Sequence, residues 1–180
     1  MAVHGCGGVG LSAVMIAAAA GARVVAVDVS PRALDLARRF GAAHCVDATS
    51  VRDPAEAVRD LTGGGAHLSL DALGAPATCA ASVNGLRRRG RHVQVGLLPS
   101  PTGTTPVPMA RAIALELELL GSHGMAAHTY PPMLELVRAG VLRPDLLVTS
   151  TLTLDAAPAA LAAMDAAGAG AGVTVIEPWG

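Results

Sequence analysis

A glycine-rich segment near the start of the chain constrains the fold most. Residues 5–10, GCGGVG, match the pattern G-x-G-x-x-G, between an apolar run that suits a strand and an Ala-rich run that suits a helix. In that context Gly5 permits a tight turn, Gly7 lets the backbone approach a pyrophosphate, and Gly10 lets the helix pack closely. The first N–H groups of the helix would face the phosphates. The segment therefore predicts a strand–turn–helix unit that binds a dinucleotide.

An acidic residue follows the next predicted strand. Asp28 comes directly after residues 23–27 and lies eighteen positions beyond Gly10. A carboxylate there can accept hydrogen bonds from the adenosine ribose and would repel a 2′-phosphate, which favours NAD over NADP. The alternative is that Asp28 only begins the turn before Ser30. We prefer the cofactor interpretation because the glycine pattern and the acid occur together.

Strands and helices are predicted to alternate along the whole chain. Ser30 and Asp53 each precede a proline and suit helix N-caps, and Gly41 suits a helix end. The expected strands are 2–4, 23–27, 45–46, 67–71 and 91–95, whereas 115–120 is either a sixth strand or a helix end. Helices are expected at 11–20, 31–40, 53–61, 76–86, 129–139 and 155–166, with extended segments at 146–152 and 173–176. This order predicts an α/β fold, a Rossmann-type doubly wound parallel sheet of six strands followed by an αβαβ segment.

Charge and cysteine content exclude several classes of function. The formal net charge of −1 leaves no basic surplus for nucleic acid. The one basic cluster, Arg87 to Arg89 with Arg91, is interpreted as a solvated helix end, with nucleic-acid contact as the alternative. Three widely spaced cysteines indicate reduced thiols and a cytoplasmic protein. The apolar run 11–20 is shorter than the roughly 20 residues that a membrane span needs.

Several segments together carry a resemblance to a known family. They are VHGCGGVGL at 3–11, AGARV at 20–24, GAA at 41–43, GGGA at 63–66, DALG at 71–74, GRHVQVGL at 90–97, GSHG at 121–124 and GVTVI at 172–176. In this order and spacing they resemble the medium-chain dehydrogenase/reductase superfamily, and most of all its zinc-dependent alcohol dehydrogenases. The resemblance implies NAD as cofactor and hydride transfer from a small alcohol. It also implies further cofactor contacts, at Gly8, Val9, Val29, Arg32, Leu73, Gly74, Gly96, Leu97, Ser122 and His123.

The chain departs from that family in one large respect. Family members carry an N-terminal catalytic domain that supplies the zinc ligands, and nothing like it precedes Met1. We therefore expect no catalytic residue and no metal site here; His123 and His128 are interpreted as loop histidines and Cys6 as a packing residue with no base beside it. Residues 1–123 would form the NAD-binding domain. Residues 124–180 would complete the missing domain, and their strands would lack pairing partners.

Three hypotheses for function follow. The first is the NAD-binding portion of a zinc-dependent alcohol dehydrogenase, truncated and inactive alone. The second is a non-catalytic dinucleotide-binding module or subunit. The third, which the length of the resemblance disfavours, is an S-adenosylmethionine-dependent methyltransferase. Family members commonly pair through the sixth strand, so the resemblance also implies a homodimer through residues 115–120.

Overall fold

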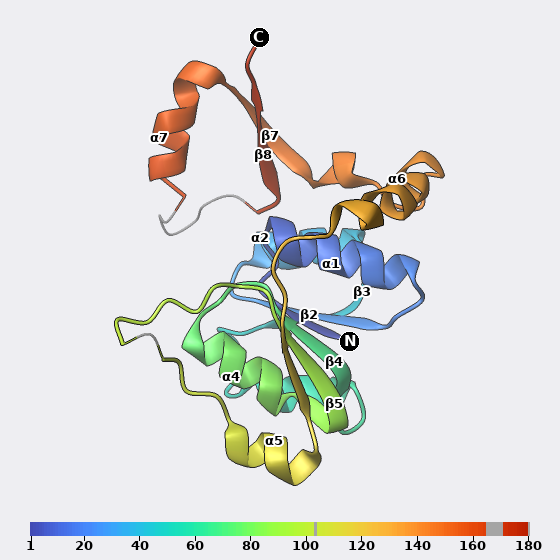
Figure 1. Ribbon diagram of the computed structural model, residues 1–180, viewed down its shortest axis with the longest axis vertical. Coiled ribbons are helices and arrows are strands. Elements are labelled where there is room, and N and C mark those ends of the chain that lie inside the picture. Colours follow the sequence, from blue (N-terminus) through green and yellow to red (C-terminus); the bar gives the residue numbers. More distant parts are fainter. Residues whose placement is uncertain (103, 165–170, 180) are drawn as a thin grey trace.

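The computed structural model describes residues 1–102, 104–164 and 171–179 (Figure 1). Strands and helices alternate as predicted in the first part of the chain. The order there is β1 (Ala2–His4), α1 (Gly8–Ala19), β2 (Val24–Asp28), α2 (Pro31–Arg39), β3 (Ala42–Asp47), α3 (Pro54–Leu61), β4 (Ala66–Asp71), α4 (Pro76–Asn84), β5 (Leu86–Gln94), α5 (Met109–Leu115) and β6 (Glu118–Gly121). The segment that was ambiguous in sequence contains both elements, because α5 ends at Leu115 and β6 begins three residues later.

The six strands form one parallel sheet with the order β3-β2-β1-β4-β5-β6. This is the order of a doubly wound dinucleotide-binding fold, so the predicted fold class is confirmed. The chain moves outward from β1 in one direction through β2 and β3, and in the other through β4, β5 and β6. The direction reverses at β1. In such sheets ligands bind in the crevice at the carboxyl ends of the strands beside that reversal.

Helices cover both faces of the sheet (Figure 1). Val24 and Ala26 of β2 belong to a buried cluster with side chains of α1 and α2. Their neighbours Val25 and Val27 belong to a second cluster on the opposite face, which includes Val58 of α3. Because alternate residues of a strand point to opposite faces, an uninterrupted apolar strand is explained by burial on both sides. The glycine loop and Asp28 therefore lie on a rigid support.

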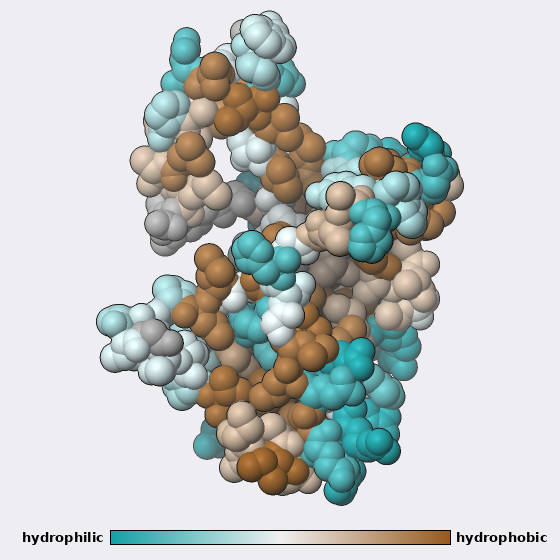
Figure 2. Space-filling view, viewed as in Figure 1, coloured by the Kyte–Doolittle hydropathy of each residue, from teal (hydrophilic) through white to brown (hydrophobic). Residues whose placement is uncertain are grey.

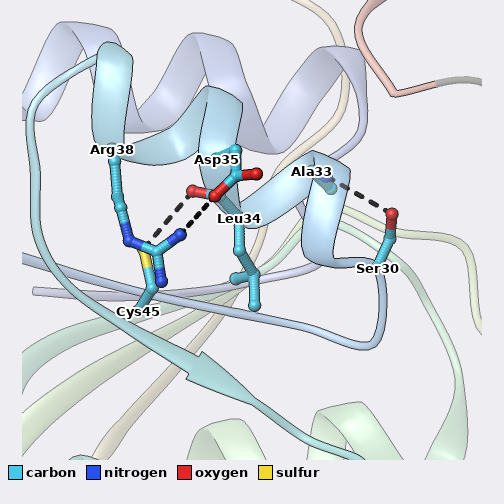
Figure 3. A network of polar contacts seen from close by, with 6 residues as sticks. All are labelled: Ser30, Ala33, Leu34, Asp35, Arg38 and Cys45. Atoms are coloured by element: carbon cyan, nitrogen blue, oxygen red, sulfur yellow. Dashed lines mark hydrogen bonds and ion pairs between the residues drawn. The ribbon is translucent and has the colours of Figure 1, made fainter.

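The start of α2 is fixed as the sequence predicts. Ser30 Oγ accepts a hydrogen bond of 3.3 Å from the Ala33 N–H, and Pro31 occupies the first helical position (Figure 3). Farther along the helix, Arg38 pairs with Asp35 at 2.6 Å, and the Cys45 thiol of β3 donates to the Leu34 carbonyl. The contact of Cys45 joins α2 to β3, whereas the other two lie within the α2 segment and stabilise the helix itself.

The interpretation of the arginine cluster as a helix end is wrong. Arg87 to Arg89 lie on β5, which begins at Leu86 rather than at residue 91. Leu86 pairs with Ala66 and Arg91 pairs with Leu68, so the residues between Leu86 and Arg91 bulge out of the ladder. The cluster is exposed, and its members find partners outside the sheet core: Arg87 contacts His67, and Arg88 pairs with Glu116. The strand continues through the arginines because Leu86, Gly90 and His92 are buried.

The last part of the chain has the predicted αβαβ order, with elements α6 (Tyr130–Arg138), β7 (Val148–Thr153), α7 (Ala157–Ala162) and β8 (Val173–Glu177). The expectation that its strands lack partners is wrong, since β7 and β8 pair with each other in a two-stranded parallel sheet. The predicted helix 155–166 is shorter in the structure, and residues 165 and 166 lie outside the described residues. Leu142 and Leu147 pack into the same cluster as Leu11 and Val14 of α1.

Candidate dinucleotide-binding site

The three glycines of the loop differ in what a side chain would meet. Gly5 has a φ of +84°, and an added Cβ would lie 2.9 Å from the Leu73 Cβ. A Cβ on Gly10 would overlap the carbonyl oxygen of Gly5. Around Gly7, in contrast, a Cβ would meet no described atom within 4 Å, and its φ of −76° is open to any residue. The fold itself therefore requires Gly5 and Gly10, whereas Gly7 leaves open space above the loop.

That open space lies at the N-terminus of α1, which begins at Gly8 rather than at residue 11 as predicted. Gly7 is the N-cap residue, and no side chain caps the helix. The first turn contains no acidic residue either. The first N–H groups of a helix have no partner within it, and together with the helix dipole they attract anions. The loop is thus open, positively polarised and accessible to a phosphate.

Asp28 lies against the glycine loop from the end of β2. Its Oδ2 accepts a hydrogen bond of 2.6 Å from the Cys6 N–H, and its Oδ1 accepts one of 2.8 Å from the Ser30 N–H. Asp28 does begin the turn before Ser30, as the structural alternative proposed. It also joins that turn to the loop, and its carboxylate is only partly buried. Each carboxylate oxygen has lone pairs beyond the one already used, so a ribose hydroxyl can still donate to it.

Two further pairs of predicted contact residues, Leu73-Gly74 after β4 and Gly96-Leu97 after β5, lie next to each other. A Cβ on Gly74 would overlap the carbonyl oxygen of Leu97, and one on Gly96 would overlap the Gly74 nitrogen. The two turns are therefore in backbone contact. The side chains of Leu73 and Leu97 are 61% and 78% exposed, which is unusual for leucine and places apolar surface at the edge of the crevice.

Other predicted contact residues are more scattered. Val9 is exposed on the first turn of α1, Val29 is exposed directly after Asp28, and Arg32 is exposed on the first turn of α2. Ser122 and His123 follow β6 and are exposed; the Ser122 N–H donates to the Gln94 carbonyl at 3.0 Å. All of these residues lie at the carboxyl-end edge of the sheet or beside it, and Ser122 and His123 are farthest from the glycine loop in strand order.

Sequence reasoning missed Asp71, the residue that organises the turns after β4 and β5. Asp71 is fully buried at the end of β4, and its side chain accepts hydrogen bonds from the N–H groups of Leu73 and Gly74. Gln94 at the end of β5 also donates to it. The available signal was an acid as the last residue of a predicted strand, as Asp28 is the last residue of β2.

The cysteine of the glycine loop is not ionised at neutral pH. Cys6 is buried inside the loop, and burial, reinforced by the Asp28 carboxylate, raises the pKa of its thiol to about 12, so it is not a thiolate at neutral pH. Across residues 1–102, 104–164 and 171–179, His, Cys, Asp and Glu side chains nowhere gather in threes that could hold a metal ion. In those same ranges no helix is both long enough and apolar enough to cross a membrane.

A hollow of about 620 Å³ lies next to the loop. Gly8 and Val9 line one side of it, and apolar residues of β7, α7 and β8 line the other, among them Leu152, Leu161 and Ile176. Val173 of β8 approaches closely enough that a Cβ on Gly8 would lie 3.1 Å from its Cγ2. In Figure 2 apolar side chains, drawn brown, are frequent over β7, β8 and α7 in the upper part of the view. The site is therefore bordered by the C-terminal segment as well as by the sheet.

Comparison with known proteins identifies the family. The sequence model of the zinc-binding dehydrogenases matches residues 8–139, well over half of the chain. The chain belongs to the zinc-binding dehydrogenase family. This confirms the resemblance that the glycine loop and the later segments indicated.

Relatives and solved structures agree with this assignment. A geraniol dehydrogenase of Castellaniella defragrans is 35% identical over 83% of the chain and 41% of its own length. An NAD-dependent alcohol dehydrogenase of Sulfurisphaera tokodaii is 33% identical over 86% of the chain and 43% of its own length. The solved alcohol dehydrogenase of Aeropyrum pernix superposes with a TM-score of 0.79 at 32% identity, over 91% of the chain and 46% of that protein. The chain thus spans less than half the length of these relatives.

Proposed function

We propose that this chain is the NAD-binding portion of a zinc-type alcohol dehydrogenase. The observation that carries the proposal is Gly7. Neither its φ nor any neighbour among the described residues requires glycine, yet it lies over an uncapped helix N-terminus beside Asp28. A glycine that the fold does not need is explained by a ligand whose phosphates approach the backbone there.

The remaining residues suit the parts of a dinucleotide. N–H groups at Gly8 and Val9 would bind the pyrophosphate, Asp28 would accept from the adenosine ribose, and Val29 and Arg32 would flank the adenosine. The other half of the cofactor would extend over β4, β5 and β6, toward the pairs Leu73-Gly74, Gly96-Leu97 and Ser122-His123. When bound, NAD⁺ accepts the hydride of the alcohol. The residues of this chain bind and orient it.

Catalysis and substrate choice are proposed for the complete enzyme rather than for this chain. Because the chain covers less than half of its relatives, the zinc ligands and most of the alcohol pocket would come from the rest of such a protein. Residues 124–180 would contribute to that second domain, which fits their apolar lining of the hollow. A small alcohol or aldehyde as substrate, a cytoplasmic location and a homodimer through β6 belong to the same proposal. The family assignment is to dehydrogenases, so the methyltransferase hypothesis is not retained.

The proposal is tested by ligand-induced stabilisation. A ligand at a hundredfold excess over its Kd stabilises the native state by about 2.7 kcal/mol, which raises the Tm of a domain of this size by about 5–10 °C. We expect such a shift with NAD⁺ or NADH and none with S-adenosylmethionine. Absence of any response to millimolar NAD⁺ and NADH would overturn the cofactor assignment.

Asp28→Ala tests cofactor choice. Loss of a charge-assisted hydrogen bond should weaken NAD⁺ binding about tenfold or more, while removing the negative charge should leave NADP⁺ affinity unchanged or improved. The control is Asp35→Ala, an exposed acid on α2 that pairs with Arg38 of the same helix. Equal NAD⁺ affinity in Asp28→Ala and the wild type would reduce Asp28 to a turn residue.

A further inference from the structure

The carboxylate of Asp71 is buried at the end of β4 and surrounded by uncharged donors. Its Oδ1 accepts from the N–H groups of Leu73 at 2.9 Å and Gly74 at 3.0 Å. Its Oδ2 accepts from Gln94 Nε2 at 2.8 Å and from Thr78 Oγ1 at 3.2 Å. The side chain is inaccessible to solvent, so it cannot contact a cofactor directly. Its hydrogen-bond partners indicate a structural role.

Those partners connect two separate turns. The side chain of Asp71 binds the turn after β4, and its backbone carbonyl accepts from the N–H groups of Val95 at 3.0 Å and Gly96 at 2.9 Å, in the turn after β5. Gln94 reinforces the link, because its Nε2 donates both to Asp71 and to the Gly96 carbonyl at 2.8 Å. One residue therefore fixes both turns, and the two are so close that neither Gly74 nor Gly96 has room for a Cβ.

Burying a carboxylate is costly unless its oxygens are fully hydrogen-bonded. The four donors that contact the Asp71 side chain are neutral groups, and two of them are backbone N–H groups. The carboxylate therefore holds the backbone of a turn in place instead of forming an ion pair. The arrangement also presents Leu73 and Leu97 outward at the edge of the crevice, where apolar side chains are exposed. Such a rigid, buried support is what a precise binding surface needs.

We propose that Asp71 is a positioning residue for the half of the dinucleotide that lies over β4 and β5. The inference rests on the proposed function, because it assumes that NAD crosses the sheet at the glycine loop. Asp28 ends β2 on one side of β1, and Asp71 ends β4 on the other. With the adenosine ribose at Asp28 and the pyrophosphate at the loop, the nicotinamide ribose lies over the turns that Asp71 fixes.

This geometry predicts a split between ligands that a general loss of stability would not produce. Asp71→Asn replaces one of the two acceptor oxygens by an NH₂ group, so a donor that now binds Asp71 loses its acceptor. We expect the Kd for NAD⁺ to rise at least fivefold, while the Kd for ADP, which contains only the adenosine and two phosphates, changes less than twofold. Isothermal titration calorimetry on the same protein preparations measures both.

Two variants keep the test decisive if Asp71→Asn folds poorly. Gln94→Met removes the donor that bridges Asp71 and Gly96, and it should give the same split with a smaller rise in the NAD⁺ Kd. Thr62→Ala is the control, because Thr62 lies at the end of α3, before β4 begins, and its Oγ1 donates to the Val58 carbonyl at 2.6 Å; its Kd values should equal those of the wild type.

The outcomes separate the two proposals. Wild-type protein that binds neither NAD⁺ nor NADH refutes the proposed function and this inference with it. Wild-type protein that binds NAD⁺, with variants that lose NAD⁺ and ADP equally or lose neither, leaves the proposed function intact and overturns the positioning role of Asp71.

Discussion

The six-stranded sheet and the C-terminal two-stranded sheet differ in how much of their surface other elements cover. Both are parallel. In the large sheet the central strands are covered on both faces, and all three residues of β1 are buried. In the small sheet most residues of β7 and β8 are exposed, including Val175 at 37% and Ile176 at 40%. Parallel sheets are normally covered on both faces, so the small one retains apolar surface for another element to cover.

The difference shows where the binding function resides. The large sheet has its own core, and the glycine loop, Asp28 and the Asp71 turns all lie on it. The C-terminal segment is anchored on α1 through Leu142 and Leu147, but it presents apolar side chains to the hollow beside the loop. We infer that the first region binds the cofactor and that the second participates in forming the substrate side of the complete enzyme.

The largest effect is expected from Gly10→Ala, which tests whether the loop is part of the rigid region. The added Cβ would overlap the Gly5 carbonyl oxygen, so either the loop or α1 must shift. We expect a loss of about 3 kcal/mol in the free energy of unfolding, measured by chemical denaturation. A variant as stable as the wild type would show that α1 is not held closely against the loop.

A matched pair of valines compares the two regions directly. Val58 is fully buried in the core under the large sheet, and Val175 is 37% exposed on β8. Val58→Ala should lower the free energy of unfolding by about 2 kcal/mol, whereas Val175→Ala should change it by less than about 0.5 kcal/mol. Equal losses in urea denaturation would contradict the contrast between a packed and an uncovered sheet.

Acid sensitivity should also originate in the large sheet. Burial lowers the pKa of His4 from its ordinary 6.5 to about 4. The nearby Asp71 carboxylate raises this pKa by a smaller amount, and His92 lowers it a little further. As pH falls below 6.5 the unfolded chain binds a proton that the native His4 does not, so stability is lost between pH 6.5 and 4. From pH 7 to pH 5 this contributes a loss of about 2 kcal/mol.

Two substitutions isolate that contribution. His4→Leu should flatten the fall in unfolding free energy between pH 7 and pH 5, while His128→Ala, at an exposed residue, should leave it unchanged. An unaltered pH profile in His4→Leu would show that another group is responsible.

Much of the large sheet was predictable because its signals are local. The G-x-G-x-x-G pattern, the Ser30-Pro31 cap and the acid at residue 28 each act through near neighbours, and their elements lie within a few residues of the predicted bounds. The arginine cluster misled because three consecutive charges resemble a helix end, while the bulge that accommodates them depends on pairing with β4. The hydrogen bonds of Asp71 also depend on partners up to twenty-five residues away, at Gly96. The different constraints on Gly7 and Gly10 depend on which atoms surround each residue in the folded chain, and the pattern alone does not specify them.

We propose that residue 7 is glycine because the phosphates of a bound dinucleotide lie against it. Calorimetric titration of NAD⁺ into the wild type and into Gly7→Val, alongside chemical denaturation of both, tests it most directly. A Cβ on Gly7 meets no described atom within 4 Å, so we expect a loss of unfolding free energy of only about 1 kcal/mol, from replacing glycine at a helix N-cap, together with a loss of NAD⁺ affinity of tenfold or more. Undiminished NAD⁺ affinity in a stable Gly7→Val protein would show that the dinucleotide does not lie against Gly7.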